Sequence, residues 1–158
     1  MKARVALTIP IVTALCAAAT AHARTTSDPC SFLSARQVAA VHVDTGCTTL
    51  RGRPNPLYTG VTATWGKLGG KGSVIVAIAA VKDPSFIALW KSAHRTGTSW
   101  HVGRWSRGTC INRGRYCYGG FIVGNDAVTI QVAAPEAKPV SVVKPTKAMA
   151  KTIAAKLS

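Results

Sequence analysis

Residues 73–81 read SVIVAIAAV, and this run of nine limits the kinds of fold that the chain can form. Its valines and isoleucines are β-branched, which favours a strand over a helix. Because the side chains are apolar on both faces, we expect this strand to be a central one, with a neighbouring strand at each of its edges. The other elements should therefore lie on either side of it.

Four further segments carry strand patterns, namely residues 61–65, 100–104, 117–123 and 127–133. In the last of these, valine and isoleucine alternate with Thr129 and Gln131, which is the period-2 pattern of a half-buried strand. Residues 124–126 (GND) are typical of a tight turn between the last two segments. A short turn joins antiparallel neighbours, so the sequence predicts an antiparallel sheet of about five strands.

Helix signals lie at three places around these strands. A Ser-x-x-Gln capping box, Ser34 with Gln37, predicts a helix over residues 35–42. An Asp-Pro pair at residues 83–84 should begin a second helix, which ends before Gly97. The apolar side of that helix is expected to carry four residues, Phe86, Leu89, Trp90 and Ala93. A third helix is expected over about residues 145–157, with apolar residues on one side and lysines on the other.

The order of these elements predicts a single α+β domain over residues 24–158. Helices packed on one face of an antiparallel sheet give such a domain one hydrophobic core. About 135 residues are enough to bury that core.

The first 23 residues have the pattern of a secretory signal. Lys2 and Arg4 form a cationic start, residues 5–21 are almost wholly apolar, and the Ala-His-Ala at residues 21–23 fits the small-x-small cleavage rule. A membrane anchor is the alternative, but the apolar run is interrupted and shorter than the roughly 20 residues that a span needs. We therefore expect a periplasmic or secreted protein without a transmembrane segment.

Positive charge dominates the composition. The 158 residues hold 20 Lys and Arg against five Asp and Glu, for a formal net charge of +15. Loss of the signal would lower this to +13, because Lys2 and Arg4 go with it. Such a balance favours an anionic partner, either an acidic protein surface or an anionic envelope polymer, with nucleic acid a less expected choice for an exported protein. Net charge informs about association rather than about fold, so a basic surface without a specific partner is the alternative.

The cysteines predict two disulfides. Cys16 lies within the signal, which leaves four cysteines, and four allow three pairings. Sequence distance and local pattern favour Cys30 with Cys47 and Cys110 with Cys117. Neither spacing matches the C-x₂₋₄-C of a zinc site or the C-x-x-C of a redox site, so no metal and no cofactor is expected.

Residues 104–120, RWSRGTCINRGRYCYGG, carry the candidate binding site. If residues 112–115 form a four-residue turn, Cys110 faces Cys117 across a hairpin, at a separation that a disulfide can bridge. Arginines can hold phosphate or carboxylate in bidentate fashion, and aromatic rings can anchor a protein contact or stack on bases. The predicted binding residues are Arg104, Trp105, Arg107, Arg113, Arg115, Tyr116 and Tyr118. The alternative is that the aromatic residues pack on the sheet and the arginines are solvated.

No catalytic pattern stands out. The sequence holds no H-x-x-x-H, no G-x-S-x-G and no paired carboxylates. Residues 69–73, GGKGS, differ from a phosphate-binding loop because Gly72 stands where Ser or Thr should follow the lysine. We therefore do not expect an enzyme.

Residues 28–40, DPCSFLSARQVAA, resemble the DPC-x-LL-T-x-x-E-V opening of small exported domains of unknown function that are common in high-GC bacteria and are often lipoproteins. Residues 150–157 are similar to the AK-x-x-A-x-x-L ending of the same domains. The family pattern includes a Gly-x-Gly-Asp turn, and this chain has the arginine-rich cysteine loop at about that place. The resemblance implies an α+β fold and an extracytoplasmic binding role, and it carries over no catalytic residue.

Taken together, the sequence predicts an exported, cationic binding module without enzymatic activity. The favoured hypothesis is a protein-binding inhibitor or immunity-type protein. A binder of anionic polymers or lipid headgroups, such as lipopolysaccharide or nucleic acid, is the first alternative, and a small hydrolase is the second.

Overall fold

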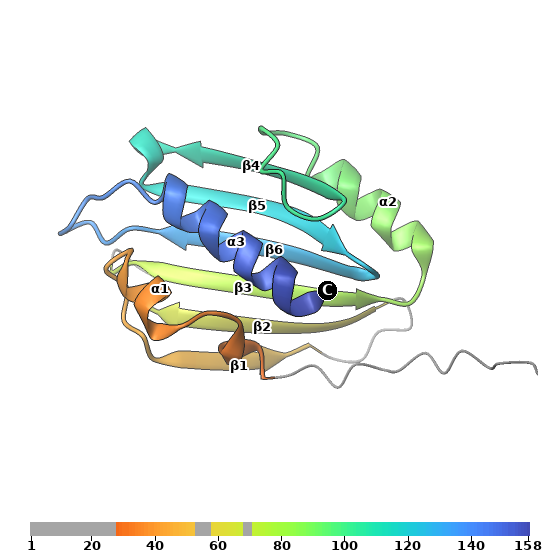
Figure 1. Ribbon diagram of the computed structural model, residues 1–158, viewed down its shortest axis with the longest axis horizontal. Helices are drawn as coiled ribbons and strands as arrows, with labels where there is room; N and C mark the ends of the chain where they lie inside the picture. Colours follow the sequence, from red (N-terminus) through yellow and green to blue (C-terminus); the bar gives the residue numbers. More distant parts are fainter. Residues whose placement is uncertain (1–27, 53–57, 68–70) are drawn as a thin grey trace, which may run out of the picture.

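The strand expected at residues 73–81 forms, and it lies in the middle of a sheet of six antiparallel strands (Figure 1). The computed structural model describes residues 28–52, 58–67 and 71–158. In chain order the elements are the 3₁₀ turn η1 (Pro29–Phe32), α1 (Ala35–Ala39), β1 (Cys47–Arg51), β2 (Tyr58–Gly66), β3 (Ser73–Val81), α2 (Pro84–Ala93), β4 (Trp105–Ile111), the 3₁₀ turn η2 (Asn112–Gly114), β5 (Tyr116–Val123), β6 (Asp126–Ala133) and α3 (Val143–Leu157). The strand order across the sheet is β1-β2-β3-β6-β5-β4.

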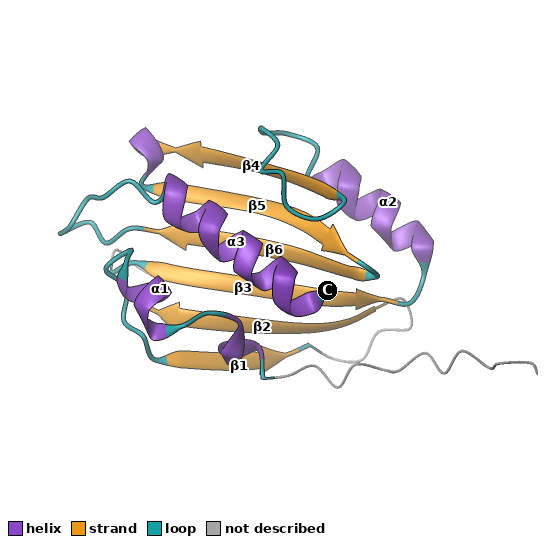
Figure 2. Ribbon diagram, in the orientation of Figure 1, coloured by secondary structure: helices purple, strands orange, loops and turns teal. Residues whose placement is uncertain are grey.

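The main core lies between one face of the sheet and the helices α1 and α3, which cross that face in Figure 2. Side chains alternate between the two faces of a strand, so Val74, Val76 and Ile78 of β3 share this face with Val128, Ile130 and Val132 of β6. All six are at most 3% exposed. Met149 and Ile153 of α3 pack on them, as the apolar side of the last helix predicts.

The second helix, α2, packs on the opposite face, and the expectation that all helices share one face is wrong in this respect. Trp90 of α2 packs on Ile122 of β5 and Ala127 of β6, which are paired across the two strands and point away from the main core. Of the expected apolar side of α2, Trp90 is buried, whereas Leu89 is 69% exposed. The molecule therefore has three layers, helix, sheet and helix, only at the end where α2 packs, and two layers elsewhere in its described part.

Two adjacent glycines of β5 make room for a tryptophan on each face. A Cβ atom on Gly119 would lie 2.6 Å from the ring of Trp100, and one on Gly120 would lie 2.5 Å from the ring of Trp90. Real Cβ atoms do not approach other atoms so closely, so only glycine lets both rings lie flat on the backbone. Gly119 thus admits Trp100 on the main-core face, and Gly120 admits Trp90 of α2 on the second face.

The strand expected at residues 100–104 is absent, and the neighbouring residues form β4 instead. Trp100 and Val102 are buried in the main core, and both backbone N–H groups donate to the hydroxyl of Ser106, at 3.3 and 3.2 Å. His101 between them has φ +53°, which breaks an extended strand. A single hydroxyl therefore satisfies donors that a sheet partner would otherwise take.

The remaining differences concern element ends and one further strand. β1 was not expected, because its residues, CTTLR, give little apolar pattern, and all five are half-buried or exposed. The first helix ends at Ala39 instead of residue 42, and α3 begins at Val143, two residues before the expected start. The strands expected at residues 61–65, 117–123 and 127–133 are confirmed, with small extensions.

Both expected disulfides are present. Cys30–Cys47 joins η1 to the edge strand β1, and Cys110–Cys117 joins β4 to β5 across directly paired positions. No helix among the described residues is long and apolar enough to cross a membrane. The expected signal, residues 1–23, lies outside the described part of the chain.

Gly108→Ala tests the packing of Trp100 on the sheet. A Cβ atom at Gly108 would lie 1.9 Å from Trp100 Cζ2, so the tryptophan or the strand would have to move. We expect the free energy of unfolding in urea to fall by roughly 1–3 kcal/mol. Gly46→Ala is the matched control, because its Cβ would meet only Asp44 Oδ1 at 3.6 Å. Equal stabilities of the two variants would show that Trp100 does not lie on Gly108.

The half-buried Cys30–Cys47 disulfide should contribute to stability by restricting the unfolded chain. It closes a loop of 17 residue steps, so replacing both cysteines with alanine should lower the free energy of unfolding by about 3 kcal/mol. Urea denaturation of the double variant and of the oxidised protein measures the difference. A loss below about 1 kcal/mol would mean that residual structure in the unfolded chain keeps residues 30 and 47 close together even without the disulfide.

Candidate functional site

The seven predicted binding residues lie along the β4–β5 hairpin but do not form one patch. Arg104 and Trp105 lie at the end of the sheet next to α2, whereas Arg113 and Arg115 lie at the hairpin tip, at the other end of β4. Seven strand residues, at about 3.3 Å each, separate the two ends by more than about 20 Å. Arg107, Tyr116 and Tyr118 lie between them, with side chains on the face opposite α3.

The hairpin tip is docked on the chain instead of projecting from it. The register is the expected one, with Ile111 opposite Tyr116. Gly114 is buried, its carbonyl accepts a hydrogen bond of 2.7 Å from Val142 N–H, and a Cβ on it would meet Val143 at 2.8 Å. The segment that enters α3 therefore fixes the conformation of the tip.

Three of the four predicted arginines donate hydrogen bonds to backbone carbonyls. The guanidinium of Arg104 donates to Gly124 O at 3.0 Å, that of Arg107 to Gly97 O at 3.3 Å, and that of Arg115 to Glu136 O at 3.4 Å. These bonds hold the side chains in place, which lowers the conformational entropy that each would lose on binding an anion. Arg113, with φ +56°, is exposed at the tip.

The predicted aromatic residues differ in accessibility. Trp105 packs edge-on against Trp90 at 5.0 Å between ring centroids, as the packing alternative expects. Tyr116 and Tyr118 lie 5.8 Å apart on the same face, and Tyr116 Oη donates to Gln131 Oε1 at 3.3 Å. Tyr118 is 37% exposed. The tyrosine pair is thus available for contact, whereas Trp105 mainly supports α2.

Around the tyrosine pair, most of the second face of the sheet is uncovered by any described element. Its side chains are half-buried or exposed, and strand alternation with the observed register places them together. We call this surface the open sheet face: Thr48, Leu50, Thr62, Thr64, Ile75, Ala77, Arg107, Thr109, Ile111, Tyr116, Tyr118, Thr129, Gln131 and Ala133.

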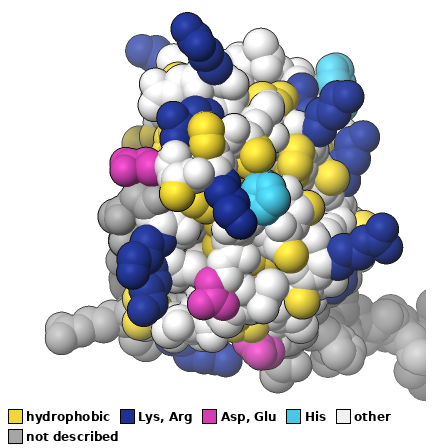
Figure 3. Space-filling view, turned by 90° about the vertical axis from the view of Figure 1, so that its left-hand side faces the viewer, with side chains coloured by type: hydrophobic (Ala, Val, Ile, Leu, Met, Phe, Trp, Pro, Cys, Tyr) yellow, Lys and Arg dark blue, Asp and Glu magenta, His cyan; other side chains and the backbone are white. Residues whose placement is uncertain are grey.

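The open sheet face is almost free of charge in a strongly charged protein. Arg107, on the edge strand β4, is its one ionisable cation, although the chain has 20 Lys and Arg. Lys67, Lys71 and Arg113 are exposed at the end of the sheet where the hairpin tip lies. Figure 3 looks onto that end and shows Lys and Arg side chains spread around it, with few Asp or Glu. The face therefore has a neutral centre, with cations at its β4 edge and at the tip end of the sheet, and we call these four residues the cationic rim.

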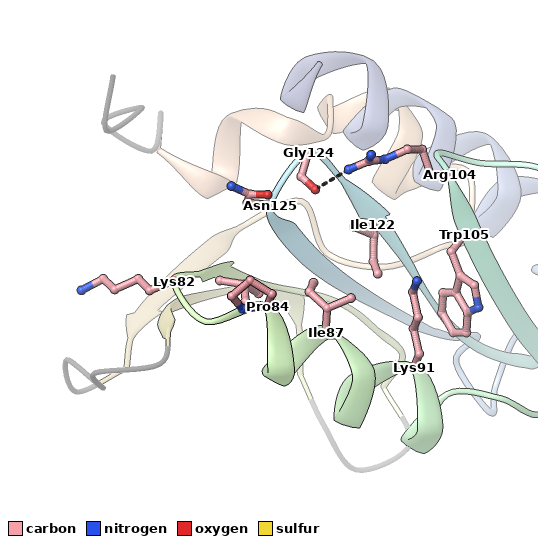
Figure 4. Close-up of a pocket in the computed structure, with 10 residues that line it drawn as sticks. Lys82, Pro84, Ile87, Lys91, Arg104, Trp105, Ile122, Gly124 and Asn125 are labelled. Atoms are coloured by element: carbon pink, nitrogen blue, oxygen red, sulfur yellow. Dashed lines mark hydrogen bonds between the residues drawn. The ribbon is translucent and has the colours of Figure 1, made fainter. Parts of the chain in front are cut away.

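A pocket lies at the opposite end, between α2 and the turn that joins β5 to β6 (Figure 4). Its volume is about 400 Å³, and it is lined by Val81, Lys82, Pro84, Ile87, Lys91, Arg104, Trp105, Ile122, Gly124 and Asn125. The N-cap of α2 holds one wall in place: Ser85 N–H donates to Asp83 Oδ1 at 2.9 Å, and this bond lowers the pKa of the Asp83 carboxyl. Arg104 and Trp105 were predicted as binding residues, but the pocket was not, because α2 and residues 124–125 carry no motif that links them.

Metal-binding side chains are not gathered at either site. Within residues 28–52, 58–67 and 71–158, no three His, Cys, Asp or Glu side chains are placed to share a metal ion. All four cysteines in these ranges are in disulfides.

Comparison with known proteins adds no homologue to this description. The chain matches no protein-family model, no curated protein and no solved structure. The resemblance of residues 28–40 to the opening of small exported domains therefore stays a prediction, and what can be said about function depends on the sites themselves.

Proposed function

We propose that this protein is an exported binding protein that docks an acidic protein on its open sheet face, as an inhibitor or immunity-type protein would. The observation that carries the proposal is the neutral centre of that face in a chain with a formal net charge of +15. Protein interfaces characteristically have an uncharged, aromatic-containing centre and a polar rim. The open sheet face has both features, with Tyr116 and Tyr118 as the aromatic anchors.

The composition of the face suits a rigid contact surface. Threonine and isoleucine are β-branched and restricted at χ1, so side chains such as Thr62, Thr64 and Ile75 lose little freedom when a partner covers them. Their strands are hydrogen-bonded on both sides, which fixes the backbone. Binding would therefore cost little ordering of this protein.

The size of the face favours a partner that also contacts the cationic rim. Six strands about 4.8 Å apart, with three rows of side chains about 7 Å apart, give roughly 500 Å² of flat area. A standard interface covers about 800 Å² on each partner. The remainder would fall on the surrounding lysines and arginines, where an acidic surface is attracted and steered.

Export supports this proposal from the sequence side. Two disulfides are usual in oxidising compartments and rare in the cytosol. The secretory-signal pattern of residues 1–23 would direct the chain to the export machinery.

Mass spectrometry of material from the cell envelope or medium should show a chain that begins at Arg24 and lacks four hydrogen atoms because of the two disulfides. A chain that begins at Met1 with free thiols would contradict the proposed compartment.

The alternative is a binder of anionic polymers or lipid headgroups, and it is favoured by the cations at the tip end of the sheet. Such ligands bind positive charge on any part of the surface and need no neutral face. An added arginine should therefore strengthen the binding of an anionic polymer on either face, but should weaken the binding of a protein only when it is placed on the open sheet face.

Ala77→Arg tests the docking of a protein on the open sheet face. Ala77 is paired with Thr62 and Thr129 near the centre of that face, so an arginine there would hold a partner away. The partner is first trapped with a photo-cross-linking residue at position 64, with position 148 on the exposed side of α3 as the control. With the trapped acidic protein, Ala77→Arg should raise the Kd at least about 10-fold, as the loss of a central contact does.

Ala148→Arg is the matched control, because it adds the same charge on the opposite side of the molecule. Its Kd should stay within about 2-fold of the unaltered protein, since a charge far outside the contact acts on the partner only through a screened, long-range attraction. If both variants bind equally well, or if cross-links form equally at positions 64 and 148, the open sheet face is not the docking site. If both variants bind anionic vesicles more tightly and no protein is trapped, the alternative is correct.

A further inference from the structure

The pocket beside α2 combines an apolar floor with cations from two separate elements. Ile87, Ile122 and Trp105 come from α2, β5 and β4, and their side chains face the space in Figure 4. Ile87 and Lys91 are four residues apart on α2, so they lie on the same side of the helix. In Figure 4 the Lys91 side chain extends from that side between Ile122 and Trp105.

Arg104 bounds the pocket opposite Lys91. Its guanidinium lies above Ile122 and donates to Gly124 O at 3.0 Å. A guanidinium carries five N–H donors, so this one bond fixes the group in position without using its whole capacity. The side-chain ammonium of Lys91, by contrast, makes no hydrogen bond or ion pair with the part of the chain that the structure describes.

The lining has no carboxylate to balance these charges. Lys82, Lys91 and Arg104 are its ionisable residues, and the others are apolar, glycine or asparagine. Asp126 lies next to this lining, in the adjoining hollow that shares Arg104 and Gly124 with the pocket. An apolar cavity whose mouth is cationic is suited to a molecule with one anionic end and an apolar body.

We propose that this pocket binds an amphipathic anion, with its anionic oxygens between Lys91 and Arg104 and its apolar part on Ile87, Ile122 and Trp105. The chemical class is an acyl chain or a hydrophobic ring with one carboxylate or phosphate. About 400 Å³ is within the range of small-molecule sites and is sufficient for a ligand of medium length. The pocket lies at the end of the sheet away from the hairpin tip, so this inference does not depend on docking at the open sheet face.

The tryptophans provide a built-in readout. Trp105 lines the pocket, and the ring of Trp90 contacts the ring of Trp105. Trp65 and Trp100 are buried on the other face of the sheet. In a ¹⁵N-labelled sample the indole N–H signals report on each separately. Decanoate, below the concentration at which it forms micelles, should shift the Trp105 signal saturably and leave the signals of Trp65 and Trp100 in place.

Two comparisons test the chemistry of the ligand. Decan-1-ol, which lacks the charge, and acetate, which lacks the apolar body, should each bind at least about 10-fold more weakly than decanoate. Decyl phosphate is the second anionic probe, and whichever of the two anions binds more tightly identifies the preferred head group. Equal binding of decanoate and decan-1-ol would overturn the proposal, because the cations would then have no role.

Lys91→Gln and Lys151→Gln form a matched pair of variants. Both remove one exposed lysine charge, but Lys151 lies on α3, which covers the other face of the sheet. Loss of a charge-assisted hydrogen bond should weaken decanoate binding about 10-fold in Lys91→Gln. Lys151→Gln should bind within about 2-fold of the unaltered protein. Equal weakening in both variants, or a shift of all four indole signals by decanoate, would mean that the anion associates with positive charge in general and would overturn the site.

Discussion

The contact of Trp90 with the bare backbone at Gly120 determines how the second face of the sheet is used. Because a Cβ at Gly120 would lie 2.5 Å from the ring, the tryptophan can lie against β5 only at a glycine. This contact places α2 at one end of the face, over Ile122 and Ala127. No other element within the described ranges covers the rest of the face beside α2, and the pocket forms where α2 meets the β5–β6 turn. Both candidate sites therefore depend on one small residue.

Charge is distributed in a way that distinguishes the two sites. The open sheet face keeps its centre neutral and has cations at its edge and at the tip end of the sheet, which suits a large acidic surface. The pocket has cations at its mouth above an apolar floor, which suits a small amphipathic anion. A high net charge serves both, because it attracts anions from a distance, while the local arrangement of side chains selects what is finally bound.

Local chemistry in the sequence predicts most of the sheet and both disulfides. The β-branched run at residues 73–81 and the Val/Ile alternation at residues 127–133 indicate strands without further context. Residues 100–104 give a wrong strand, because two buried side chains look like a strand pattern while the hydroxyl of Ser106 takes their N–H groups. The position of α2 and the pocket could not be predicted, since they follow from contacts between segments that are distant in the chain. The sequence predicts four arginines as binding residues, and that prediction gives no sign that they lie at different ends of the sheet, which follows only from the register.

Docking of a partner on the open sheet face requires that solvent reaches this face in the isolated protein. Paramagnetic relaxation of side-chain methyl groups by a neutral gadolinium chelate measures this directly. The methyl groups of Thr64 in β2 and of Ile75 and Ala77 in β3 should relax strongly. Those of Val74 and Val76, which are fully buried on the other side of β3, should not. If the two sets are protected to the same degree, the face is covered in the isolated protein and cannot be the surface on which a partner docks.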